Sequence, residues 1–137
     1  RKDVPIPKTF ENPVKLGTNG YSWNIKIVNE DNNLYLRYSL YDRNHNVILI
    51  DKMIIRAKGY STFKINNPAN SFRLTLEYVT QDSNLDYNNN YVYETTNETP
   101  KIDTSEGIKT PNKKDDSLVV YDFEPDTSRE SIIIRIN

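Results

Sequence analysis

The chain has no cysteine and only one histidine, His45, among its 137 residues. Without cysteine it cannot build a disulfide framework, a thiolate metal site or a cysteine nucleophile. A single histidine also excludes a metal centre with several histidine ligands. The longest uninterrupted apolar run, at 47–50, is far shorter than the roughly 18 residues of a membrane-spanning helix, so we expect no membrane span.

Alanine is scarce as well, and the chain has no excess of basic residues. There are two alanines against eighteen asparagines, fourteen isoleucines and ten tyrosines. Alanine is the best helix former, whereas isoleucine and tyrosine suit pleated strands. The formal net charge is −1 and the pI is about 5.9, so we expect no nucleic-acid partner, because such proteins usually carry a basic stripe. About a quarter of the residues are Leu, Ile, Val or Phe, which is enough for one domain over 1–137.

Alternation of apolar and polar residues predicts strands with one buried face. It is clearest at 21–28, 34–41 and 71–80. The segment 47–56 is apolar on both faces and predicts a central strand with a bulge. Shorter strands are predicted at 60–65, 91–93, 118–123 and 132–136.

Polar turns separate these segments, and no stretch has a helical period. We therefore predict an all-β fold, a single antiparallel β-sandwich of jelly-roll or immunoglobulin-like type with about seven or eight strands. Two segments lie outside the pattern. Residues 1–20, with three prolines, predict an extended N-terminal arm, and 96–116 predict a long polar insert loop that is at least partly ordered. The apolar residues of this insert are Ile102 and Ile108.

The best candidate for a metal site is the polar loop that follows the strand at 71–80. Asp82, Asn84, Asp86 and Asn88 alternate there, like the first ligands of an EF-type calcium loop. Tyr87 occupies the place of the turn glycine, and no bidentate acid follows at the twelfth position. The alternatives are therefore a calcium site and an asparagine-rich solvated hairpin loop.

Tyrosine gives the strongest indication of ligand binding. Tyr35, Arg37 and Tyr41 are expected to share the outer face of the strand at 34–41. An exposed tyrosine offers a flat apolar ring with a polar tip, which suits a sugar ring or a partner protein. The other interpretation is that a second sheet or a loop covers this face.

The stretch from Trp23 to Val79 resembles small bacterial β-sandwich modules of the pre-peptidase C-terminal type. The similar features are a strand ending in Leu40-Tyr41-Asp42, a polar hairpin followed by Asn46-Val47-Ile48, and the turn before Gly59-Tyr60. The chain also resembles small secreted domains of unknown function from low-GC Gram-positive bacteria. The resemblance implies a secreted, non-catalytic appendage that binds a substrate or matrix and sometimes calcium.

No catalytic motif is present, and His45 lies in a predicted exposed loop, so we expect no enzyme activity. The favoured function is a secreted or cell-surface module, monomeric, that binds a glycan or protein ligand. One alternative is a regulator or inhibitor of another protein that acts through 96–116. In that case deletion of this loop should abolish partner binding and hardly change the melting temperature. A small hydrolase with a carboxylate pair is the third hypothesis.

Overall fold

The computed structural model describes residues 23–65, 71–105, 107–124 and 131–137, and of 113–115 the backbone alone. The arm predicted at 1–20 lies outside these residues. Among the described residues, no helix is long and apolar enough to cross a membrane. The strands in chain order are β1 (Trp23–Asn29), β2 (Tyr35–Asp42), β3 (Val47–Ile55), β4 (Tyr60–Ile65), β5 (Phe72–Leu85), β6 (Tyr91–Thr95), β7 (Lys113–Asp115), β8 (Leu118–Phe123) and β9 (Ser131–Ile136).

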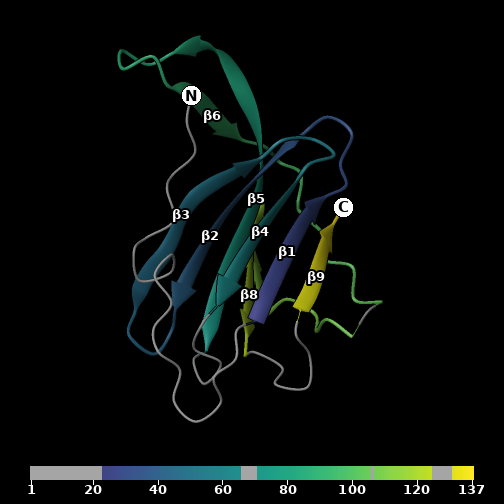
Figure 1. Ribbon diagram of the computed structural model, residues 1–137. Coiled ribbons are helices and arrows are strands. Elements are labelled where there is room, and N and C mark those ends of the chain that lie inside the picture. Colours follow the sequence, from purple (N-terminus) through teal and green to yellow (C-terminus); the bar gives the residue numbers. More distant parts are fainter. Residues whose placement is uncertain (1–22, 66–70, 106, 125–130) are drawn as a thin grey trace.

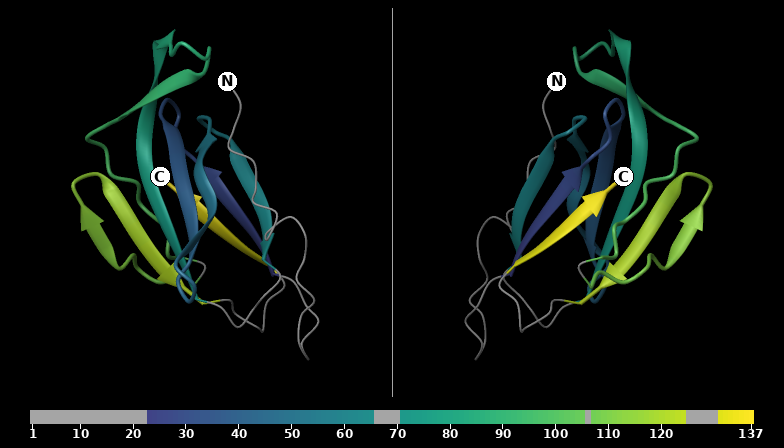
Figure 2. Two further views of the ribbon diagram at one scale, coloured as in Figure 1. Left: turned by 90° about the vertical axis from the view of Figure 1, so that its left-hand side faces the viewer. Right: turned by 90° about the vertical axis from the view of Figure 1, so that its right-hand side faces the viewer.

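These strands form two open sheets that face each other (Figure 1, Figure 2). The smaller sheet has the order β4-β1-β9. The larger sheet has the order β3-β2-β5-β8-β7, and β6 pairs with β5 beside this path. The predicted all-β, sandwich-like architecture is therefore confirmed.

The prediction of a purely antiparallel sandwich is wrong for the smaller sheet, which is mixed. β4 pairs with β1 in antiparallel fashion, but β9 runs parallel to β1, from Asn24 opposite Ser131 to Asn29 opposite Ile136. Alternation identifies which face of a strand is buried, and it is the same for either strand direction. The sequence pattern therefore found β9 but could not give its direction.

The core lies between the two sheets and contains the faces that alternation predicted. The inward residues of β1, β2 and β5 are almost completely buried: Trp23, Ile25, Ile27, Leu36, Tyr38, Leu40, Phe72, Leu74, Leu76 and Tyr78. Aromatic rings join the sheets at one end, where the Trp23 and Phe123 ring centroids lie 5.9 Å apart. Phe123 also stacks on Phe72 at 5.7 Å and on Tyr121 at 5.4 Å.

The strand predicted to be central, β3, is instead an edge strand of the larger sheet. Its register against β2 shifts twice, between Tyr38 and Leu40 and again between Leu40 and Tyr41. Each shift is a bulge that interrupts alternation, so consecutive apolar residues need not mean two buried faces. Val47 and Ile48 in fact remain 45% and 46% exposed.

The segment predicted as a long insert loop runs beside the outer edge of β9. Lys101 and Asn137 exchange two backbone hydrogen bonds of 3.0 and 2.9 Å, and Ile102 forms a bridge with Ile136. Ile102 and Ile108 are both buried in the core. Residues 113–115 form β7, which pairs with β8. The described part of the segment is therefore packed onto the sandwich through its two isoleucines.

Candidate functional site

β5 is much longer than its neighbours, and its second half leaves the sandwich. Residues up to Val79 pair with β2, whereas the pairing with β6 runs from Val79 to Leu85. The resulting β5–β6 hairpin projects beyond the two sheets at one end (Figure 1). A surface therefore forms between this hairpin and the turn that links β3 to β4.

This surface is hollowed into a groove of about 680 Å³. We call it the tyrosine groove, and it is lined by Tyr35, Ile54, Ile55, Arg56, Lys58, Gly59, Tyr60, Gln81, Tyr91 and Tyr93. Tyr60 is 63% exposed and Tyr91 is 43% exposed. Four tyrosines from three different strands, β2, β4 and β6, thus meet at one open depression.

Tyr35 and Tyr93 form the floor of the groove where β2 and β6 flank β5. Their ring centroids are 5.9 Å apart with an angle of 43° between the planes. Val79 lies opposite Tyr35 on one side and opposite Thr95 on the other. Val79 is completely buried and yet does not belong to the core cluster, because it points to the outer face of the sheet. The tyrosine pair therefore lies across a strand whose outward residue, Val79, is completely buried.

The turn from Arg56 to Gly59 forms the opposite wall. Lys58 has a left-handed φ of 60°, and the Gly59 amide donates to the Arg56 carbonyl at 2.9 Å. A Cβ on Gly59 would lie 3.0 Å from that carbonyl oxygen, so only glycine fits without a shift of the turn.

Asn29, at the end of β1, holds this turn from inside the protein. Its side chain is fully buried, and its Nδ2 donates to the carbonyls of Leu34, Ile55 and Arg56 at 2.9, 3.3 and 3.1 Å. Its Oδ1 accepts a hydrogen bond of 3.1 Å from the Asp31 amide. One amide side chain thus ties the β1–β2 turn to the β3–β4 turn and fixes the backbone under Arg56.

The three residues predicted to share a binding face do lie on alternate positions of β2. Only Tyr35 reaches the groove. Arg37 is engaged by Glu77, with 3.0 Å between Nε and Oε2. Tyr41 lies at the other end of the strand, opposite Ile48 and Arg73. Of the three, Tyr35 alone lines the tyrosine groove, and a common binding face of Tyr35, Arg37 and Tyr41 stays a prediction.

The four residues of the predicted calcium loop occupy the tip of the β5–β6 hairpin and the end of β5. Asp82 Oδ1 accepts a hydrogen bond of 2.9 Å from the Asn84 amide. Asp86 Oδ1 accepts two, from the amides of Asn88 and Asn90, each at 2.9 Å. These carboxylates close turns of the backbone. Within the described ranges no three acidic or histidine side chains cluster as a metal site would require. Calcium binding by this loop stays a prediction.

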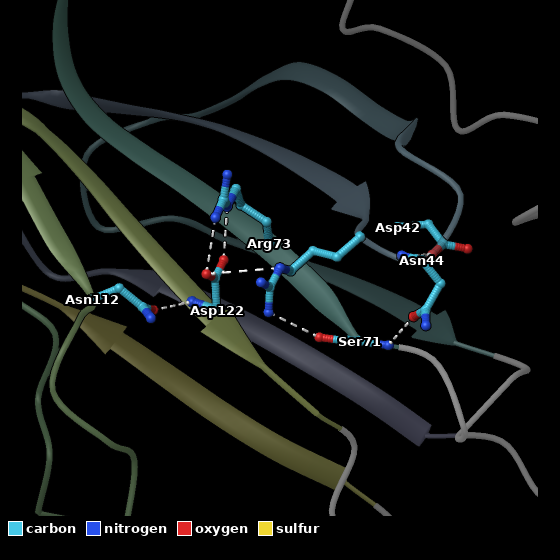
Figure 3. A network of polar contacts seen from close by, with 7 residues as sticks. Asp42, Asn44, Ser71, Arg73, Asn112 and Asp122 are labelled. Carbon is cyan, nitrogen blue, oxygen red and sulfur yellow. Dashed lines mark hydrogen bonds and ion pairs between the residues drawn. The ribbon is translucent and has the colours of Figure 1, made fainter.

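A second cavity, of about 670 Å³, lies at the other end of the sandwich near Asp122. Arg73 donates to both carboxylate oxygens of Asp122, at 2.8 and 3.0 Å, and Arg43 lies 3.7 Å from one of them (Figure 3). The Arg73 hydrogen bond lowers the pKa of Asp122 below its ordinary value, and the same bond raises the pKa of Arg73. Arg43 in turn donates to Ser71 at 3.2 Å.

His45 has a partner that the sequence did not reveal. Its Nδ1 lies 2.9 Å from Asp42 Oδ2, and the other oxygen of Asp42 accepts from the amides of Asn44 and His45. The His45 side chain is 67% exposed. Asp42 thus organises the β2–β3 turn, and neither residue lines the tyrosine groove or the Asp122 cavity.

Comparison of the chain with protein-family models, with curated proteins and with solved structures gave no significant match. The resemblance of 23–79 to pre-peptidase C-terminal modules therefore remains a prediction. The candidate site rests on the geometry of this chain alone.

Most residues that line the groove were not predicted from the sequence to be ligand-binding residues. The sequence places Tyr60, Tyr91 and Tyr93 in predicted short strands, and Arg56 and Lys58 at a strand end and in a turn. Tyr60 and Tyr91 share one signal, because each begins a strand next to a turn, whereas Tyr93 lies in the middle of β6. That signal becomes specific only when the pairing of β6 with β5 is known.

Proposed function

We propose that this protein is a non-catalytic binding module and that the tyrosine groove is its ligand site. The observation that carries the proposal is the groove lining, which in the described part of the chain has four tyrosines, two cations and no carboxylate. Large tyrosine rings with limited side-chain freedom provide contact area and hydrogen-bonding hydroxyls at low entropic cost. A groove that is open along one side suits a chain-like ligand better than an enclosed pocket would.

A carbohydrate is the ligand class that fits this lining best. The apolar face of a sugar ring can lie on a tyrosine ring while the sugar hydroxyls contact Gln81 and the tyrosine hydroxyls. Tyr60 and Tyr91 are the most exposed of the four rings, so they are the surfaces offered to a ligand. Tyr35 and Tyr93 are half-buried and support them from below.

For the fold we propose an immunoglobulin-like sandwich rather than a jelly roll. The β2–β3 hairpin pairs with β5, and β5 pairs with β8, which matches the order C′-C-F-G of one immunoglobulin sheet. β1 and β4 then take the places of strands B and E in the other sheet. β9 departs from the pattern, because it runs parallel to β1.

Two alternatives have less support. A regulator acting through 96–116 would present that segment to a partner, yet Ile102 and Ile108 are buried in the core. A carboxylate-dependent hydrolase needs a general acid whose pKa is raised. Asp122 lines a cavity together with Glu124, but Arg73 holds the pKa of Asp122 low. An ionised, doubly hydrogen-bonded carboxylate suits a structural role.

We also propose that the module is monomeric and acts outside the cell or at its surface. The asparagine- and tyrosine-rich, cysteine-free composition favours this location by analogy with exported bacterial modules. Fractionation of cells that express the full-length gene product tests the location. Sedimentation of the purified chain tests the monomeric state.

The test of the binding site is a carbohydrate array probed with the wild-type protein and with Tyr91→Ala and Tyr60→Ala variants. Both variants should lose the glycan signals that the wild type gives. Tyr87→Ala is the matched control, because Tyr87 lies on the same hairpin, is 98% exposed and does not line the groove. Equal loss in the control, or no loss in the groove variants, would contradict the assignment.

A further inference from the structure

The charges on the tyrosine groove are of one sign. Arg56 and Lys58 line it and are both exposed, and no aspartate or glutamate is among the described residues that line it. A third cation lies beside it, since Lys26 Nζ is 4.3 Å from the centroid of the Tyr60 ring. This local excess contrasts with the formal net charge of −1 for the whole chain.

The two lining cations are held by a turn of defined shape. The left-handed φ of Lys58, the hydrogen bond from the Gly59 amide and the Asn29 bond to the Arg56 carbonyl fix the backbone from which both side chains project. Less conformational freedom is then lost when a ligand binds, which favours affinity.

Three acids near this end of the protein are engaged by partners outside the groove. Glu77 pairs with Arg37, and Glu30 lies 3.8 Å from Arg135. The Asp31 carboxylate accepts hydrogen bonds from the amides of Asn33 and Leu34 at 2.9 and 2.7 Å. None of these acids lines the groove, so Arg56 and Lys58 have no acidic neighbour among the groove residues that the structure describes.

We infer that the ligand is an acidic carbohydrate, of the kind built from uronic acid units. Each such unit has an apolar ring face for the tyrosines and a carboxylate at the ring edge for a cation. The planar Arg56 guanidinium matches a carboxylate with two parallel hydrogen bonds, and the Lys58 ammonium adds a point charge. This inference rests on the proposed function and narrows its ligand class.

Other polyanions fit less well. A nucleic acid would also stack on tyrosines, but its phosphates call for a longer basic surface than two lining cations in a chain with net charge −1. An acidic peptide offers carboxylates without flat rings for Tyr60 and Tyr91. Both remain as outcomes of the test.

The experiment is calorimetric titration of the folded chain with galacturonic acid oligosaccharides and with the same oligosaccharides methyl-esterified, which removes the charge and keeps the rings. Hyaluronan oligosaccharides provide a second acidic probe. Polyglutamate and oligo-dT represent the peptide and nucleic acid. Arg56→Gln with Lys58→Gln is the test variant, and Lys64→Gln with Lys101→Gln serves as a charge-matched control, because both lysines are exposed and neither lines the groove.

We expect at least one acidic oligosaccharide to bind about tenfold more tightly than the ester or a neutral glucan, a difference of roughly 1.4 kcal/mol. The Arg56/Lys58 variant should lose this preference, and the control should keep it. Raising the salt from about 0.05 to about 0.5 M should weaken acidic binding, since exposed charges are then screened.

Each of the following three results would overturn the inference. If neutral and acidic oligosaccharides bind equally and Tyr91→Ala abolishes both, the groove is a glycan site without charge selection, and the proposed function stands alone. If polyglutamate or oligo-dT binds as tightly as every acidic oligosaccharide, the carbohydrate is not the recognised class. If no oligosaccharide of either kind binds, the inference and the proposed glycan function both fail.

Discussion

Tyr35 on β2 and Tyr93 on β6 place their rings 5.9 Å apart across the end of β5, above a completely buried Val79. Two segments that are distant in sequence therefore form one aromatic floor. The pair joins the projecting hairpin to the sandwich, so the groove keeps its shape only if these rings stay together.

The Tyr35–Tyr93 contact predicts a measurable coupling in stability. Tyr35→Ala and Tyr93→Ala, alone and together, should give a coupling free energy of about 0.5–1.5 kcal/mol in urea unfolding, as packed aromatic pairs do. The matched pair Tyr35→Ala with Tyr87→Ala should be additive, because Tyr87 is 98% exposed. An additive result for Tyr35 and Tyr93 would mean that the two rings do not support each other.

Asn29 links stability to the shape of the groove. Asn29→Ala leaves three carbonyls without their side-chain donor, and we expect the free energy of unfolding to fall by about 2–3 kcal/mol. Asn24→Ala is the control on the same strand, since Asn24 is exposed. Amide hydrogen exchange should show faster opening of the Arg56–Gly59 turn in the Asn29 variant. Unchanged exchange there would show that Asn29 does not hold this turn.

Tyr78 makes the protein sensitive to alkali. Its hydroxyl is buried with no hydrogen-bond partner among the described residues, and burial together with the charges of Asp31, Glu30 and Glu98 raises its pKa above the ordinary 10.0. Above pH 10 the unfolded state releases this proton while the folded state keeps it, so the unfolded chain binds fewer protons. Folding stability must then fall as pH rises beyond 10.

Tyr78→Phe removes both the unpartnered hydroxyl and the titration. The variant should be more stable than the wild type by about 1 kcal/mol at neutral pH and should lose less stability above pH 10. Urea unfolding monitored at several pH values measures this. Tyr87→Phe, at an exposed position, should leave both quantities unchanged. A destabilised Tyr78→Phe variant would show that the hydroxyl has a favourable partner.

The described part of 96–116 contributes to stability. Ile102 and Ile108 are 9% and 5% exposed, and each truncation to alanine should cost about 2–4 kcal/mol in unfolding free energy. Thr104→Ala, at an exposed position, should cost little. The expectation that this segment can be deleted with an unchanged melting temperature does not fit the burial of its two isoleucines. If the alanine variants are as stable as the wild type, the expectation that 96–116 can be deleted without loss of stability would hold after all.

The sequence predicts some parts of the fold correctly and others not. Alternation placed Trp23, Tyr38 and Leu74 in the core, because a strand with one buried face repeats every two residues. It misplaced β3, because two bulges produce a continuous apolar run in an edge strand. It could not give the direction of β9, which depends on how the chain crosses between the sheets.

The site was harder to predict than the fold. Tyr35 was identified because it lies on an outward position of a clear strand. Arg56, Tyr60 and Tyr93 were not identified. They come together only through the register between β5 and β6 and through the hydrogen bond from the Asn29 side chain to the Arg56 carbonyl. The number of tyrosines suggested a binding surface, but its position depends on how the strands pair in the folded protein.

The most direct test of the account is the affinity of acidic oligosaccharides, those of galacturonic acid and of hyaluronan, for the wild type, for Tyr91→Ala and for Tyr87→Ala, measured by calorimetry on folded protein. The account predicts binding to the wild type and to Tyr87→Ala, and a loss of about tenfold or more in Tyr91→Ala. Equal affinity in Tyr91→Ala and Tyr87→Ala, or no binding by the wild type, would contradict it.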